Sequence, residues 1–258
     1  MQDEAIIRAA MKYKNWLAVL SVGALFLLGT QYPRFAAADL SPQQVDRLRM
    51  QALAGQQAQT VPTLKQAAEH GNLLAHRALA EIFLRHPQTA QEGVQFAENA
   101  AKNGDALAQF MLGKAYFDGT ATSTHVPDMA RARHWLELAA ERKHANAMYL
   151  LGLMHKAGYT GKIDFYLAAQ WFARAVQLDH ADAMFMLGNA YHAGEGVKQD
   201  ELQAVRLYQA AAKKEHPLAT QTLAMAYRDG GLGLAQDKKE ADIMMMEVAH
   251  ILSHPGHQ

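Results

Sequence analysis

The fold is decided by the stretch ADAMFMLGNAYHAGEGVKQD, residues 181–200. Its small residues and leucine recur at helical spacing, two glycines then interrupt the pattern, and Asp200 is a preferred N-cap for a second helix. The run Ala210-Ala211-Ala212 falls within that second helix. The stretch therefore predicts two helices joined by a short loop.

The same helix pair is expected five times, and the spacing between the copies is constant. The leucines of the first helices and the caps of the second helices are Leu79, Leu112, Leu151, Leu187 and Leu223, and Thr89, Asp128, Asp164, Asp200 and Asp237. Each cap lies 23 residues before the next leucine (89 to 112, 128 to 151, 164 to 187, 200 to 223), whereas the spacing from each leucine to its own cap varies. A constant spacing combined with one loop of variable length is typical of a repeat array. Such an array favours a binding function over catalysis.

A core with two alanines, a Leu-Gly pair and a tyrosine occurs at residues 106–116 and 181–191, and in looser form at 145–155 and 217–227. This core resembles the Sel-1-like repeat, a short relative of the tetratricopeptide repeat, over about residues 71–250. The resemblance implies an all-α fold, a right-handed superhelix (solenoid) of about five helix pairs, and a role in protein–protein interaction. A plain tetratricopeptide array is the alternative, which its strict 34-residue period disfavours.

The chain is expected to divide into a leader, a capping region, the array and a tail. Their ranges are 1–38, 39–70, 71–252 and 253–258, and the five units lie near 72–105, 106–144, 145–180, 181–216 and 217–252. In the capping region, Ser41-Pro42 is a helix-start signal. It predicts a helix to Ala54, followed by a polar connector over 55–62 and a half-unit over 63–70.

The helices of the five pairs follow from the same pattern. First helices are expected near 73–84, 106–118, 145–157, 181–193 and 217–229, and second helices near 90–103, 129–142, 165–178, 201–214 and 238–252. At the turns between pairs, Lys143, Asp179 and Glu215 replace the earlier glycines Gly71 and Gly104. Because glycine eases a left-handed C-cap, we expect the later turns to be tighter or strained.

The first 38 residues have the pattern of an export signal. Arg8, Lys12 and Lys14 precede the uncharged run WLAVLSVGALFLLGT, residues 16–30, and a small-x-small site ends at Ala38. We expect cleavage near Ala38; an uncleaved inner-membrane anchor through residues 16–32 is the alternative. Both place the array in the periplasm, because the basic flank stays inside. A buried N-terminal helix of a cytosolic protein is the third interpretation.

Composition excludes several kinds of site. Lys+Arg and Asp+Glu are equal at 25 each, so no positive excess is available for a nucleic-acid partner. The absence of cysteine excludes disulfides, thiolate metal sites and a cysteine nucleophile. No cofactor is expected.

Histidine gives the most regular chemical pattern, with His144, His180 and His216 at 36-residue intervals. Equivalent positions in a stacked array lie roughly 10 Å or more apart, so these imidazoles cannot share an ion, and we interpret them as lining the turns. His250, His254 and His257 lie near the end, where no carboxylate joins them, and we expect no functional metal site. No nucleophile elbow, phosphate-binding loop or His-Glu-x-x-His motif is present, so no catalytic residue is predicted. Met244-Met245-Met246 is interpreted as core filler.

One face of the first helices points away from the second helices and presents three rows of aligned residues. The rows are Phe110, Tyr149, Phe185 and Gln221; Lys114, Leu153, Asn189 and Met225; and Phe117, Lys156, His192 and Arg228. The aromatic row fits packing between units, whereas the third row changes chemistry from unit to unit, which packing does not require. The candidate binding residues are Phe110, Lys114, Phe117, Tyr149, Lys156, Phe185, Asn189, His192 and Arg228.

The expected function is a non-enzymatic scaffold or adaptor in the bacterial cell envelope that binds a protein or peptide on its concave face. The resemblance implies assembly of secretion, polysaccharide or other envelope complexes. Two alternatives stay open: a cell-wall-associated enzyme or glycan-binding protein, and a secreted protein that acts on a host. The long loop Gly119–Pro127 is a further place to look for the partner.

Overall fold

The computed structural model describes residues 40–159 and 161–253, and every regular element in these ranges is a helix. The twelve helices are α2 (Pro42–Leu53), α3 (Gln57–Glu69), α4 (Leu73–Leu84), α5 (Ala90–Lys102), α6 (Ala106–Phe117), α7 (Met129–Glu141), α8 (Ala145–Ala157), α9 (Phe165–Val176), α10 (Ala181–Ala193), α11 (Glu201–Ala212), α12 (Pro217–Asp229) and α13 (Lys238–Ser253). The export signal predicted at 1–38 lies outside the described residues. Among the described helices, none combines the length and hydropathy required to cross a bilayer.

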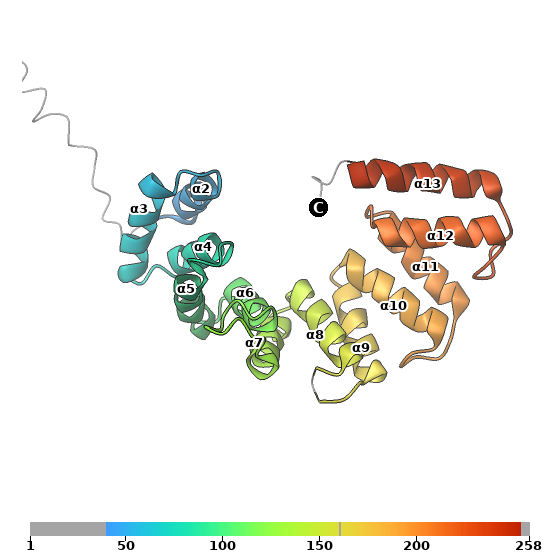
Figure 1. Ribbon diagram of the computed structural model, residues 1–258, viewed down its shortest axis with the longest axis horizontal. Helices are drawn as coiled ribbons and strands as arrows, with labels where there is room; N and C mark the ends of the chain where they lie inside the picture. Colours follow the sequence, from blue (N-terminus) through green and yellow to red (C-terminus); the bar gives the residue numbers. More distant parts are fainter. Residues whose placement is uncertain (1–39, 160, 254–258) are drawn as a thin grey trace, which may run out of the picture.

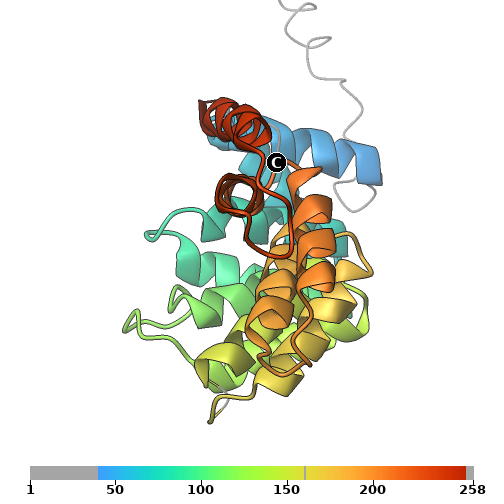
Figure 2. The ribbon, with the colours of Figure 1, turned by 90° about the vertical axis from the view of Figure 1, so that its right-hand side faces the viewer.

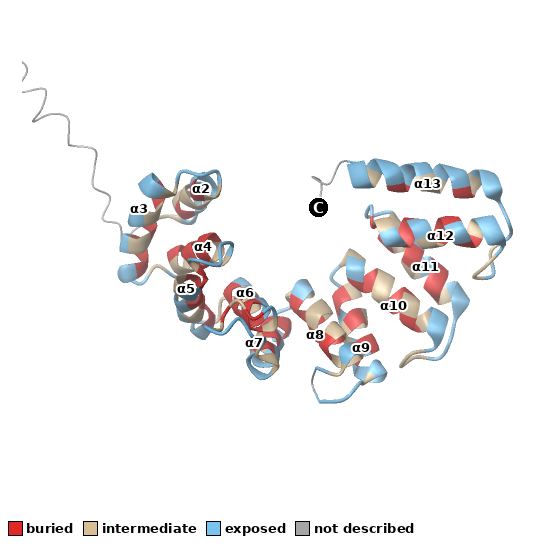
Figure 3. Cartoon of the chain, viewed as in Figure 1, coloured by how far each residue is buried: buried red, intermediate tan, exposed pale blue. Residues whose placement is uncertain are grey.

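The helices form a right-handed αα solenoid, as the resemblance implied. Each first helix packs against its own second helix, and each second helix packs against the first helix of the next pair. Figure 1 shows the resulting arc, with α4, α6, α8 and α10 on its inner side. In Figure 3 the buried residues line the faces where neighbouring helices meet, and exposed residues line the outer faces.

Side-chain caps start most of the second helices. Asp128, Asp164 and Asp200 each accept a hydrogen bond from the backbone N–H three residues on, which confirms the predicted caps. Asp237 accepts from two N–H groups at the start of α13. Thr89 was predicted to cap α5 and does not: its hydroxyl donates to the carbonyl of Phe83 at 2.8 Å, so it closes the loop after α4 instead.

The capping region differs from its prediction in one segment. Ser41 caps the start of α2 as expected, and it also forms a capping box with Gln44. The polar connector expected over 55–62 is wrong, because α3 is already helical from Gln57. Pro62 lies inside this helix, and the buried side chains of Thr60 and Leu64 hold that turn against its neighbours.

The glycine of the repeat core lies where the two helices of a pair touch. Gly113, Gly152 and Gly188 face Leu136, Phe172 and Tyr208, respectively. A Cβ at Gly188 would lie 2.7 Å from the Tyr208 ring, and one at Gly152 would overlap the ring of Phe172. The large residue on the second helix therefore requires the glycine on the first.

The turns between pairs are left-handed, whether or not they contain glycine. Lys143, Asp179 and Glu215 have φ of 61°, 65° and 59°, the conformation of Gly71 and Gly104 at the earlier turns. A non-glycine residue in this region carries a cost of roughly 1–2 kcal/mol. The later turns therefore carry the strain that the sequence predicted.

Candidate protein-binding surface

The aromatic row of the first helices lies at the junctions between units. Phe110 stacks on His144 with ring centroids 4.4 Å apart. Tyr149 on His180 and Phe185 on His216 repeat this stack at 4.9 Å. In each case the histidine precedes the first helix of the next unit. These three predicted residues are therefore half-buried within the solenoid.

Two of the stacked histidines also start a helix. Nδ1 of His180 accepts from the N–H of Ala183 at 3.2 Å, and His216 repeats this cap. Nε2 of His216 lies 3.1 Å from Asp182, and this bond lowers the pKa of the carboxyl group. Burial lowers the pKa of both His144 and His180. The periodic histidines therefore act in packing and capping.

The first junction of the array uses an ion pair in place of a ring stack. Arg77 stands at the position of Phe110, and Asp105 at the position of His144. The guanidinium of Arg77 bonds the Asp105 carboxylate at 3.0 Å, and Asp105 also caps α6. The sequence analysis did not predict this pairing. The available signal was that Arg77, like Phe110, stands five residues after the N-cap of its helix.

The second row also has partners within the fold. Lys114 forms an ion pair with Asp118 on the last turn of its own helix. Asn189 accepts a hydrogen bond at 2.8 Å from the hydroxyl of Tyr208, a group whose pKa is raised to about 12 by burial. The binding role of Lys114 and Asn189 stays a prediction.

The third row divides into two parts. Phe117 meets Tyr159 edge-on at 5.9 Å, and the Lys156 ammonium bonds Glu195 at 2.6 Å while lying over the Phe165 ring. The structure therefore joins Phe117 to the α8–α9 loop, and Lys156 to the start of α9 and the α10–α11 loop. The side chains of His192 and Arg228 are exposed and lie on later helices, α10 and α12.

A group of apolar residues, named here the aromatic edge, includes this contact. It consists of half-buried Phe117 and the exposed residues Tyr159, Ile163, Phe165, Tyr166 and Leu167. Tyr166 is 62% exposed and Ile163 57%, although both side chains are large and apolar. The sequence analysis identified only Phe117, because the other five lie in and just after the loop of variable length. The available signal was the aromatic residues on both sides of the cap Asp164.

The following repeat holds the aromatic edge in place. The α10–α11 loop passes so close to the start of α9 that a Cβ on Gly196 would collide with the backbone carbonyl of Phe165. Gly196 also has φ of 73°, which favours glycine. The edge therefore rests on a backbone contact between two units as well as on the Lys156–Glu195 pair.

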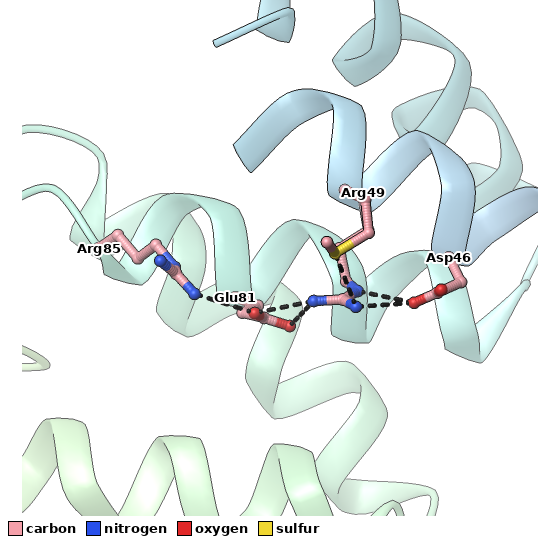
Figure 4. Close-up of polar contacts among 5 residues, drawn as sticks. Asp46, Arg49, Glu81 and Arg85 are labelled. Atoms are coloured by element: carbon pink, nitrogen blue, oxygen red, sulfur yellow. Dashed lines mark hydrogen bonds and ion pairs between the residues drawn. The ribbon is translucent and has the colours of Figure 1, made fainter. Parts of the chain in front are cut away.

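A groove lies between α4 and α6 on the inner side of the arc, with a volume of about 360 Å³. Phe110 and Lys114 contribute to its lining, together with apolar and charged neighbours from both helices. Figure 4 shows that Glu81, on its wall, is bonded by Arg49 of α2 and by Arg85, the C-cap residue of α4. Arg49 also bonds Asp46 on its own helix. The Arg49–Glu81 ion pair therefore holds the capping helix α2 against the array.

Within the described residues, no three possible metal ligands of the His, Cys, Asp or Glu type come together; His254 and His257 lie outside those residues.

Comparison with known proteins identifies the repeats. The family model described as Sel1 repeat matches residues 106–144, 145–180 and 181–216. A Sel1 repeat protein from Oxalobacter formigenes is 24% identical with a TM-score of 0.72, over 87% of this chain and 92% of that one. A protective antigen of uropathogenic Escherichia coli with the SLR fold is 22% identical with a TM-score of 0.71, over 82% of this chain and 49% of that one.

An immunity protein of Pseudomonas aeruginosa is similar at a lower level, with 17% identity and a TM-score of 0.54 over 84% of this chain and 85% of that one. No curated protein sequence matches the chain. These structural likenesses establish the fold.

Proposed function

Since this chain carries three Sel1 repeats within a helical solenoid, we propose that it is a non-enzymatic scaffold of the bacterial cell envelope that binds a partner protein at the aromatic edge. Sel1 repeat proteins are in general protein-interaction scaffolds. The envelope location is supported by the charged start, the apolar run and the small-x-small site of residues 1–38. Assembly of a secretion, polysaccharide or other envelope complex is the role that such a scaffold would serve.

The observation that carries the proposal is the exposure of the aromatic edge. Five large apolar side chains are exposed within residues 159–167, which span the α8–α9 loop and the first turn of α9. Monomeric proteins seldom expose apolar side chains in such a group, and a larger patch usually marks an interaction site. Tyrosines are enriched among residues that dominate binding energy, because each offers a large rigid ring and a hydroxyl. The cluster therefore has the composition of an interface centre.

The charges around the edge indicate how the partner is recognised. Lys156 borders the edge, and its ammonium already bonds Glu195 and lies over Phe165, whereas Lys162 is exposed within the edge segment. The charge of Lys156 is therefore satisfied within the protein, and it orients the Phe165 ring. We infer that the partner supplies apolar or aromatic side chains to the edge.

Crosslinking in living cells tests this proposal. A photo-reactive amino acid placed at Lys162, an exposed loop position between Tyr159 and Ile163, is expected to trap the partner for identification by mass spectrometry. The variant Tyr159→Ala/Tyr166→Ala is expected to reduce the crosslinked product at least about tenfold, since it removes two aromatic contacts.

The matched control is Leu202→Ala. Leu202 is 61% exposed and stands two residues after the α11 cap, as Tyr166 does after the α9 cap, but it lies outside the aromatic edge. It is expected to leave the crosslink unchanged. The proposal would be contradicted if the tyrosine variant kept the crosslink while circular dichroism showed unchanged helical content.

A further inference from the structure

The outer face of α13 differs from that of every earlier second helix. Ile243 and Met246 are 45% and 65% exposed on it. Ile243 stands six residues after the cap Asp237, and the residues at this position in α5, α7, α9 and α11 are exposed and polar: Gln95, His134, Gln170 and Arg206. The equivalents of Met246 are Glu98, Glu137, Ala173 and Gln209. An outer position that is polar in four units is therefore apolar in the last one.

Packing within the last pair does not account for these two residues. The run Met244-Met245-Met246 was predicted to fill the core, and the prediction is wrong for its third member. Met244 and Met245 are half-buried on the side of α13 that faces α12, whereas Met246 lies on the opposite side. No described helix covers that side in either view of the molecule (Figures 1 and 2).

Two charges stand symmetrically about Ile243 on the same face. Lys239 stands four residues before Ile243 and Glu247 four residues after it, so all three lie on one face of α13. Both charged side chains are exposed, and neither forms an ion pair with another described residue. We name this face, Lys239, Ile243, Met246 and Glu247, the outer strip.

The outer strip is complementary to itself. If two α13 helices pack antiparallel across a two-fold axis at Ile243, Lys239 of each copy lies opposite Glu247 of the other. The same arrangement brings Ile243 of both copies together at the centre, sets Met246 of each copy opposite position 240 of the other, and leaves opposite charges at both ends. A parallel arrangement in register would place like charges together and is disfavoured.

We propose that the outer strip binds a second copy of this chain and forms an antiparallel α13–α13 dimer. At the opposite end of the array, the exposed face of α2 carries Gln43, Asp46 and Arg47 beside a single large apolar side chain, Met50. A two-fold contact uses the same strip on both copies, so the dimer is closed. One helix per copy forms a small interface, so the dissociation constant is about micromolar. The dimer holds two solenoids end to end and leaves each aromatic edge available, so the proposal is independent of the partner.

Charge reversal tests the arrangement by analytical ultracentrifugation of residues 39–258 across a hundredfold concentration range. Lys239→Glu places like charges at both ends of the interface and is expected to raise the dissociation constant at least about tenfold. The double variant K239E/E247K restores opposite charges across the two-fold axis and is expected to recover dimerisation. Arg206→Glu, at an equivalent outer position of α11, is the control for an added surface charge and is expected to have no effect.

A cysteine crosslink gives a second readout. Because the chain contains no cysteine, Ile243→Cys introduces a single thiol close to the two-fold axis. Mild oxidation is expected to give a covalent dimer, whereas Arg206→Cys stays monomeric. A monomeric parent chain at all concentrations would overturn the proposal. So would a dimer that K239E does not weaken and that Ile243→Cys does not trap, because it would form through another surface.

Discussion

At the scale of single residues, the N-cap of each first helix links one unit to the next. His180 accepts the N–H of Ala183 and at the same time stacks on Tyr149 of the preceding unit. Asp105 combines the same cap with an ion pair to Arg77. One side chain therefore starts a helix and also fixes how that helix is placed on its neighbour, so a change at this position acts on a whole junction.

This dual role makes stability depend on pH. Burial lowers the pKa of His144 and His180 in the folded protein, and the nearby carboxylates of Asp105 and Asp182 offset it only in part. The unfolded chain keeps the ordinary value of 6.5 and so binds more protons below it. The free energy of unfolding is therefore expected to be highest above pH 6.5 and to fall as the pH drops through that value.

Urea unfolding at a series of pH values between about 8 and 5 measures this effect. The variant His144→Asn/His180→Asn is expected to lose part of the pH dependence, because asparagine caps a helix without titrating, as Asn72 does at the start of α4. If the parent and the variant lose stability in parallel over this range, the buried histidines are not the cause.

At the scale of the helix pair, stability depends on a match of sizes between the two helices. Gly152 faces Phe172, whereas the equivalent positions of the last pair hold Ala224 and Met245. Gly152→Ala is expected to lower the free energy of unfolding by about 1–3 kcal/mol through overlap with the ring. This loss occurs although alanine is the better helix former by about 1 kcal/mol.

The double variant Gly152→Ala/Phe172→Met reproduces the combination found in the last pair. Because methionine is flexible, it is expected to lose less stability than the sum of the two single changes, and thermal unfolding of all four proteins measures the coupling. Strict additivity would show that the glycine is not required by the ring.

The pair is also the scale at which the sequence was most informative. Asp128, Asp164 and Asp200 were identified as caps because a cap acts on N–H groups a few residues away. The Lys156–Glu195 pair joins residues 39 positions apart, and the stacks on the histidines join successive units, so local pattern could not reveal them. The aromatic edge was missed for a different reason. It combines the variable α8–α9 loop with residues of α6 and of the first turn of α9, and the repeat pattern does not bring these together.

At the scale of the whole molecule, the question is whether the array is released or held at the membrane. N-terminal sequencing of the protein purified from its native envelope is expected to begin at Asp39, since the small-x-small site ends at Ala38. An intact N-terminus in the membrane fraction would instead favour the anchor through residues 16–32. Recovery from the cytosol would contradict export altogether.

The junctions also constrain how such a chain can change its length. Residues 106–144, 145–180 and 181–216 each present an aromatic ring to the histidine that closes the same segment. An in-frame duplication or deletion of any of these segments leaves every stack matched. The first unit also carries both members of its own pair, Arg77 and Asp105, whereas the last unit has Gln221 at the ring position. The gene can therefore gain or lose whole repeats before the last unit, while the last unit keeps its place.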